Sequence, residues 1–311
     1  MINCMKNGSA PNRPNKYSSE AEAYASALLT VCFFPVRGRY RKYKSQTILA
    51  GGLFDMKKAL IVLMGLLMTV LAVAGCGGEG KKTVDAPKVL KVGTEPTFAP
   101  FEFQKEGSKD YDGFDMDLIR AIGKQLNMKV EIQNMGFDAL IPAINAGNID
   151  VAAAGMSITP ERQNAVDMSD PYYVSGLVVV VNKDNMDTKS IKDLDNKAIA
   201  TQIGTTGAER AAKVPGAKVK TFNTNTEAFL ELKNKGVEAV IIDKPVAEYY
   251  LVQGGQSTAK IVGETLEAES YGFSLKKGSA LTKEINKALS DLKKNGEYDK
   301  IYKKWFGDVK K

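Results

Sequence analysis

The sequence predicts an α/β fold with two lobes, each built on a parallel sheet, joined by a two-strand hinge. Strand-like and helix-like segments alternate twice, first within residues 88–154 and again within residues 198–252. That order favours parallel strands with helices packed on the faces of a sheet. Two extended segments, Tyr172–Val178 and Glu269–Phe273, would carry the chain to the second lobe and back. We therefore expect a cleft between two lobes that can close around a ligand.

The proposed lobes are not contiguous in the sequence. The predicted boundaries are residues 88–175 plus 272–311 for the first lobe and residues 176–271 for the second. At 311 residues the chain is long enough to bury a sizeable core in each lobe.

In the first unit, the spacing of apolar residues indicates which segments are strands and which are helices. It reads as strand, loop, helix, strand, helix and strand at Val89–Val92, 93–103, 118–126, 130–132, 140–147 and Val151–Ala154. Leu118, Ile119 and Ile122 share one helical face, and Gly147 is a helix-ending glycine.

The second unit repeats this alternation. Its strands are expected at Ala198–Thr201, 219–222 and Val240–Ile242, and its helices after Gly204, at 228–235 and from Pro245. Thr206 and Glu209 fit a capping box at the start of the first of these helices. A further helix is expected near the end of the chain, lined by Ile285, Leu289 and Leu292.

The composition excludes several functional classes. No histidine occurs, so Ser-His-Asp catalysis, Cys-His catalysis and zinc sites with imidazole ligands are excluded. The net charge of +7 lies largely at the chain ends, and we expect no nucleic-acid surface. Cys4, Cys32 and Cys76 are the three cysteines, so the folded body has no disulfide. We expect no cofactor and no metal.

The N-terminal region predicts export and a lipid anchor. Lys57 and Lys58 precede an apolar run and then small residues, which is typical of a secretory signal peptide over residues 56–75. The ending 71–76 resembles a bacterial lipobox, which implies cleavage before Cys76 and a diacylglycerol on its sulfur.

Two further expectations follow from the same region. Residues 76–87 would form the lipidated cysteine and its tether, and residues 1–55 an upstream extension that is not native. The alternative to the signal peptide is a membrane helix that stays uncleaved.

The stretch Ala154–Arg162 is predicted to contact a ligand. Thr159 and Pro160 start a helix, which puts Arg162 in its first turn, where the helix dipole disfavours a cation. A guanidinium beside the free backbone amides of Gly155 and Ser157 would clamp a carboxylate. A surface salt bridge to Glu161 or Asp167 is the alternative.

Several stretches resemble one known family. They are Gly93–Phe103, Gly113–Leu118, Met135–Ala143 and Ser169–Tyr173. Together they are similar to the extracytoplasmic solute-binding proteins of polar amino acid ABC importers, and the likeness runs from about residue 88 to residue 307. The resemblance implies a bilobed periplasmic-binding-protein type 2 fold, one amino acid per cleft, and docking on a membrane permease.

The resemblance also implies roles for individual residues. Arg162 would hold the ligand's α-carboxylate, helped by Ser157 and by backbone amides near Thr205 and Thr206. Backbone amides at a helix N-terminus suit an anion. For Thr206 the alternative is a plain helix cap.

The ammonium would be held from the other lobe. The resemblance assigns it to Asp243, with the carbonyl of Gly155. For Asp243 the alternative is a carboxylate that shields the start of the helix at Pro245.

The remaining implied contacts concern the ligand's side chain. Phe98 and Phe137 would sandwich its apolar stem, although each could instead be a core residue. Glu95 would accept hydrogen bonds from an amide or a guanidinium, and Gln202 would lie beside it.

The predicted function is therefore a monomeric, lipid-anchored, extracytoplasmic binding protein that is not an enzyme. It would capture a polar amino acid, with glutamine first and arginine or histidine next. The alternatives are a small dehydratase-like enzyme on the same fold, with Glu95 as general acid, and a ligand sensor.

Overall fold

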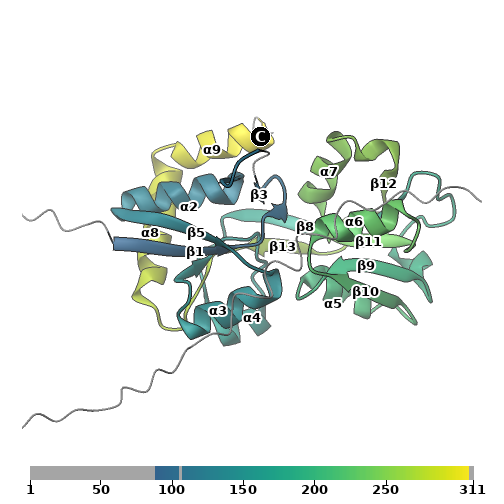
Figure 1. Cartoon of the computed structure of the whole chain (residues 1–311), viewed down its shortest axis with the longest axis horizontal. Helices are drawn as coiled ribbons and strands as arrows, with labels where there is room; N and C mark the ends of the chain where they lie inside the picture. The colour runs from purple at the N-terminus through teal and green to yellow at the C-terminus, as the bar shows by residue number, and fades with distance from the viewer. Residues whose placement is uncertain (1–87, 105–106, 308–311) are drawn as a thin grey trace, which may run out of the picture. The chain divides into compact units, whose positions relative to one another are not determined.

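The computed structural model describes residues 88–104 and 107–307, which form two main β-sheets with helices on both faces (Figure 1). The predictions for the upstream extension, the signal peptide, Cys76 and the tether lie outside the described residues. Among the helices of the described part, none has the length and hydropathy that a membrane span requires.

The first sheet is mixed, so the expectation of a purely parallel sheet is wrong. Its order is β5-β1-β6-β14-β7. Strands β5, β1 and β6 are parallel, whereas β14 runs antiparallel to both β6 and β7. The antiparallel strand arises because the chain enters this sheet again on its return from the second one. The bounds are β1 Lys88–Thr94, β5 Met128–Asn134, β6 Val151–Ala152, β7 Asp167–Met168 and β14 Ser274–Leu275.

Helices cover both faces of the first sheet. Helices α2, α8 and α9 lie on one face, and α3 and α4 on the other (Figure 1). Their bounds are α2 Phe114–Gln125, η1 Phe137–Ala139, α3 Leu140–Ala146, α4 Pro160–Ala165, α8 Ala280–Lys294 and α9 Glu297–Phe306. Helix α9 was not predicted, although the spacing of Tyr298, Ile301, Tyr302 and Trp305 marks one helical face.

The second sheet is mixed for a similar reason. Its order is β10-β9-β11-β8-β12, and the long strand β8 runs antiparallel to β11 and β12. The strands are β8 Tyr173–Asn182, β9 Ala198–Gln202, β10 Lys218–Phe222, β11 Ala239–Asp243 and β12 Ala259–Val262. The helices are η2 Ile191–Leu194, α5 Thr206–Ala212, α6 Asn225–Lys233, α7 Lys244–Val252 and η3 Gly255–Ser257. We call the parts built on the two sheets the first half and the second half.

Two extended segments connect the halves, in the regions where the sequence predicts a hinge. Strand β13, Ala268–Tyr271, pairs antiparallel with the start of β8, and Tyr271 lies opposite Tyr173. The remainder of β8 belongs to the second sheet, so β8 and β13 run side by side between the two sheets (Figure 1). The predicted lobe boundaries themselves stay a prediction.

The segment expected to be a loop over residues 93–103 contains two short strands. Strands β2 Thr97–Phe98, β3 Glu102–Gln104 and β4 Tyr111–Asp112 form a small antiparallel sheet. The strand expected to reach Ala154 ends at Ala152. The two short strands matter for function because β2 positions Phe98 and β3 positions Glu102. The earlier end of β6 matters because the residues that follow it leave the sheet.

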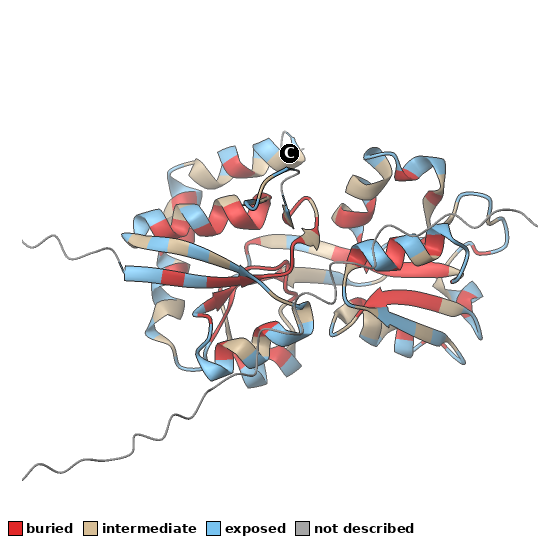
Figure 2. Cartoon of the chain, viewed as in Figure 1, coloured by how far each residue is buried: buried red, intermediate tan, exposed pale blue. Residues whose placement is uncertain are grey.

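The core lies along the central strands, which are red in Figure 2. In β8, residues Leu177–Val181 are all buried. An aromatic cluster packs near the pairing of β8 with β13. There the ring of Phe101 lies 5.1 Å from that of Tyr271 and 4.8 Å from that of Tyr173. The connection between the halves is thus anchored in the core.

Gly113, which precedes α2, is the glycine whose replacement we expect to cost most. It has a φ of 130°, and a Cβ atom there would lie 2.0 Å from the carbonyl oxygen of Phe101. Gly147, the C-cap of α3, has a φ of 77° with nothing within 4 Å of such an atom.

Chemical denaturation of two alanine variants tests this difference. Gly147→Ala should lower the free energy of unfolding by about 1 kcal/mol, from backbone strain alone. Gly113→Ala adds a backbone clash and should cost more than about 3 kcal/mol. Equal costs for the two variants would contradict the close approach of α2 to β3.

Candidate functional site

A narrow cavity of about 20 Å³ lies between the two halves. Its lining contains every residue that the sequence predicts to bind ligand, together with Glu102, which was not predicted. The first half contributes Glu95, Phe98, Glu102, Phe137, Ala154, Gly155, Ser157 and Arg162, and the second half Gln202, Thr205, Thr206 and Asp243. Ligand contact by these residues stays a prediction, but the structure brings them together.

Strand ends supply five residues of this lining. Glu95 follows β1, Ala154 and Gly155 follow β6, Gln202 ends β9 and Asp243 ends β11. Ligands in α/β folds bind at the carboxyl ends of parallel strands because loops diverge there. The cavity is therefore at the position that the topology favours.

Arg162 is buried, with 7% of its surface exposed. Thr159 caps α4 by accepting the backbone N–H of Arg162, as predicted. The guanidinium donates from Nη1 to the carbonyl of Ser157 (2.8 Å) and from Nη2 to the carbonyl of Gly204 (3.0 Å). The ion pairs of the described residues do not include Arg162, so the predicted alternative of a surface salt bridge is wrong.

Two further contacts of Arg162 bear on its role. Its guanidinium carbon lies 5.4 Å from the centroid of the Phe137 ring. Burial lowers its pKa, and the nearby carboxylates of Glu209, Glu269 and Asp243 oppose that effect. Because Gly204 belongs to the second half, this buried cation also links the two halves.

Asp243 faces the cavity with hydrogen bonds that hold its carboxylate in place. Its Oδ1 accepts from the hydroxyl of Tyr271 and from Ser175 Oγ (3.2 Å). It directly precedes α7, but its side chain makes no capping hydrogen bond. Burial, followed by the charge of Glu269, raises the pKa of Asp243 to about 7.

The backbone amide of Gly155 is hydrogen-bonded, whereas the sequence predicted it to be free. Its N–H donates to Asp115 Oδ2 (2.9 Å), so it is not free to bind a carboxylate. The same oxygen accepts from the hydroxyl of Tyr172 (2.5 Å). Asp115 is fully buried, which raises its pKa to about 7, and a buried carboxylate needs such donors. The amide of Gly155 therefore holds the strand end, and its carbonyl remains the part that could accept from an ammonium.

Thr205, rather than Thr206, caps α5. Its Oγ1 accepts the N–H of Ala208 (3.2 Å) and donates to the carbonyl of Gln202 (2.8 Å). The predicted capping box at Thr206 is therefore wrong by one residue. The shift leaves Thr206 as the first residue of the helix, at the cavity wall.

Glu102 is the residue that sequence reasoning missed. It is 1% exposed, and its Oε2 has no hydrogen-bond partner among the described residues. Burial and the charges of Asp115, Glu95 and Asp243 raise its pKa well above the ordinary value. The available signal was a lone acidic residue between Phe101 and Phe103, in a segment with few other charges.

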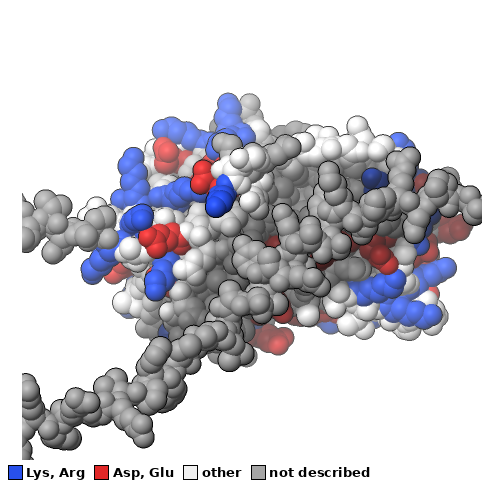
Figure 3. All heavy atoms as spheres, viewed as in Figure 1, with Lys and Arg blue, Asp and Glu red and all other residues white. Residues whose placement is uncertain are grey.

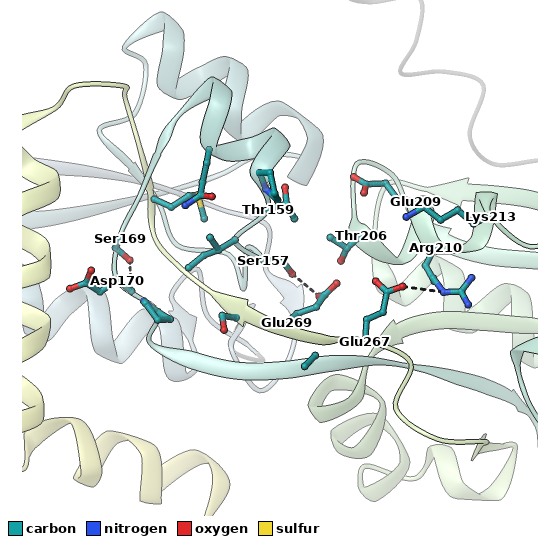
Figure 4. A pocket seen from close by; sticks show the side chains of 17 residues that line it. Ser157, Thr159, Ser169, Asp170, Thr206, Glu209, Arg210, Lys213, Glu267 and Glu269 are labelled. Atoms are coloured by element: carbon teal, nitrogen blue, oxygen red, sulfur yellow. Dashed lines mark hydrogen bonds and ion pairs between the residues drawn. The ribbon is translucent and has the colours of Figure 1, made fainter.

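A larger open groove of about 680 Å³ shares Ser157 and Thr206 with the cavity. Figure 4 shows the Ser157 hydroxyl donating to Glu269 (2.7 Å), and Arg210 pairing with Glu267 (3.5 Å). The remaining charged side chains that line it, those of Asp170, Glu209 and Lys213, are exposed. We place the functional site in the smaller cavity, where the charges are buried.

The charge of the cavity contrasts with that of the surface. On the face shown in Figure 3, basic and acidic side chains are interspersed. The cavity instead combines one guanidinium with the three carboxyl groups of Glu95, Glu102 and Asp243. A small molecule that carries both a positive and a negative charge would complement this lining.

These features define a two-part binding protein for a small charged solute. Residues 90–308 match the family described as bacterial extracellular solute-binding proteins, family 3, and the chain belongs to that family. The family's description places the protein outside the cytoplasm.

Individual proteins of known name are similar over nearly their whole length. The arginine-binding extracellular protein ArtP of Bacillus subtilis is 34% identical over 256 residues, which cover 81% of this chain and 98% of ArtP. An ancestral arginine-binding protein bound to arginine has a solved structure with 49% identity and a TM-score of 0.68, covering 70% of this chain and 98% of its own. The similarity thus extends to the solute-binding role within ABC transport of amino acids.

One solved structure bears on the enzyme alternative. It is the ancestral amino acid-binding protein AncCDT-1, a precursor of cyclohexadienyl dehydratase, with 41% identity, a TM-score of 0.65, and coverage of 70% of this chain and 95% of its own. It too is named as a binding protein.

Proposed function

We propose that this protein captures one amino acid with a cationic side chain, arginine above all, for delivery to an ABC permease. The observation that supports this most strongly is the charge of the cavity, where three buried carboxyl groups face one buried guanidinium. The proposal changes the order expected from the sequence, which put glutamine first.

The two ends of a free amino acid account for one pair of these charges. Arg162, beside the first turn of α5, suits the α-carboxylate, and Asp243 suits the α-ammonium. Both must be paired together, because one unpaired buried charge costs several kcal/mol. The two side chains come from different halves, so one ligand satisfies both only while the halves are together.

Glu95 and Glu102 then remain for the ligand's side chain. A guanidinium or ammonium group would neutralise them and fill their acceptor positions. A glutamine side chain could donate hydrogen bonds from its amide but would leave the charge of an ionised Glu95 uncompensated. The apolar stem would lie along Phe98, with Phe137 opposite.

We also propose that the protein is not an enzyme. The dehydratase-like alternative needs a protonated carboxyl at the ligand, and Glu102, rather than Glu95, now suits that role better because its pKa is raised further. A bound amino acid recovered unchanged after prolonged incubation supports binding alone, and its conversion to another compound would support the enzyme.

We further propose that the mature protein is a monomer anchored by lipid at Cys76, with a tether to residue 87. The supporting observation is the match of residues 71–76 to a lipobox ahead of the described residues. The intact mass of membrane-extracted protein should begin at acylated Cys76. Residues ahead of Cys76 in the mature form would overturn this anchor.

Calorimetry with arginine and citrulline, its uncharged counterpart, tests the side-chain assignment. The wild-type protein should bind arginine at least about tenfold more tightly, since a buried charge-assisted hydrogen bond contributes about 1.5–3 kcal/mol. Glu102→Gln should reduce that ratio, whereas Arg162→Ala should abolish binding of both ligands.

Thermal unfolding of each variant serves as the folding control for these measurements. Preferential binding of glutamine or citrulline by the wild-type protein would contradict a cationic ligand. Retained arginine affinity in Arg162→Ala would contradict the carboxylate clamp.

Ligand affinity should depend on pH with a definite sign. Asp243, with a pKa of about 7, must be ionised to pair with an ammonium. Affinity should therefore fall as the pH drops below about 7, by up to about tenfold per pH unit for each proton displaced. The slope should be steeper for arginine than for glutamine, because Glu102 must ionise as well.

The stability of the ligand-free protein should depend on pH in the opposite direction. The raised pKa values of Asp115 and Asp243 favour the protonated folded state, so this contribution to stability is lost as the pH rises through about 7. Calorimetry of ligand binding in buffers of different protonation enthalpy counts the protons that each ligand releases when it binds. Equal proton release for arginine and glutamine would contradict the role of Glu102.

A further inference from the structure

We propose that Asn225 is a positioning residue that sets how strongly the cleft prefers a cationic side chain, by orienting the two donors that Glu95 receives. Asn225 does not line the cavity, and the sequence did not single it out. The inference rests on the proposed function, because it concerns the carboxylate that would meet the ligand's cation.

Asn225 makes two hydrogen bonds toward this carboxylate. It is the first residue of α6 and is 4% exposed. Its side-chain Nδ2 donates to Gln202 Oε1 (2.9 Å), and its backbone N–H donates to Thr97 Oγ1 (3.2 Å). Gln202 and Thr97 are the two side chains that donate to Glu95.

The first route runs through the amide of Gln202. Its Nε2 donates to Glu95 Oε2 (2.8 Å) and to the carbonyl of Asn223 (2.9 Å). A backbone carbonyl can only accept, so the NH₂ group must face this side and the amide oxygen the other. Nδ2 of Asn225 is the donor that meets that oxygen. Without it, a buried acceptor would lose its partner, and the amide would be free to reorient.

The second route runs through the hydroxyl of Thr97. Its oxygen accepts the N–H of Asn225, so its own proton is directed to Glu95 Oε2, at 2.7 Å. This N–H is among those that a helix start leaves without a partner inside the helix. Here the first turn of α6 uses it across the cleft.

Both donors converge on one oxygen of Glu95. Glu95 also lines the cavity, so a ligand there could reach the other carboxylate oxygen, Oε1. Burial raises the pKa of Glu95, and these two hydrogen bonds, together with one from the backbone of Thr97, oppose that rise, whereas the charge of Glu227 adds to it. The hydrogen bonds favour the ionised carboxylate that a cationic side chain requires.

The network crosses from one half to the other. Glu95 and Thr97 belong to the first half, and Gln202 and Asn225 to the second. The Gln202 donor therefore reaches Glu95, and the N–H of Asn225 reaches Thr97, only while the halves are together. Closure and the preference for a cation are coupled through Asn225, in addition to any contact with the ligand's two ends.

The affinity ratio of arginine to citrulline tests this role. Asn225→Ala removes the side-chain donor but keeps the backbone N–H, and should lower the ratio about fivefold to tenfold. It should also move the fall of arginine affinity to a higher pH, because Glu95 ionises less readily. Thr226→Ala, at the exposed next residue of the same turn, is the matched control and should change neither quantity.

A double-mutant cycle separates positioning from a structural role. In a Gln202→Ala background, Asn225→Ala should change the ratio by less than about twofold, because its route is already lost. An unchanged ratio in the single variant, or the same loss in both backgrounds, would overturn this inference alone. Absence of arginine binding by the wild-type protein would overturn the proposed function and this inference with it.

Discussion

The structure depends on a positive charge buried between two halves of one chain. Arg162 bonds to carbonyls of both halves and is surrounded by the carboxylates of Asp243, Glu209 and Glu269 at longer range. A guanidinium in such surroundings has to be balanced, and the carbonyls of Ser157 and Gly204 do so only in part. A ligand carboxylate would complete the balance and also draw the second half onto the first.

In the proposed function, the acidic side of the cavity selects the charge of the ligand's side chain. Pairing the two ends of an amino acid leaves Glu95 and Glu102, both buried. Their raised pKa values show that burial opposes their charge, so an incoming cation would be favoured both by attraction and by relief of that penalty. Hydrogen bonds from Thr97 and Gln202 keep Glu95 closer to ionisation than Glu102. Two carboxyl groups in one cavity therefore differ in character because their donors differ.

Local sequence patterns predicted what is decided locally. Thr159 caps α4 and Gly147 ends α3, because caps depend on neighbours within a few residues. The antiparallel β14 was missed because its direction depends on the chain's return from the other sheet, which periodicity does not encode. The site residues were brought together as the family resemblance implied, but the hydrogen bond from Gly155 to Asp115 spans 40 positions and has no local signal. Glu102 and Asn225 were missed for the same reason: their importance arises from partners in distant segments.

A structure of the protein with bound arginine tests the central claim most directly. The account predicts the α-carboxylate on the Arg162 guanidinium, the ammonium at Asp243 Oδ and the Gly155 carbonyl, and the ligand's guanidinium against Glu95 Oε1 and Glu102. Arginine bound in the reverse direction, or outside the cavity, would contradict it. So would a ligand whose side chain leaves both glutamates in contact with protein alone.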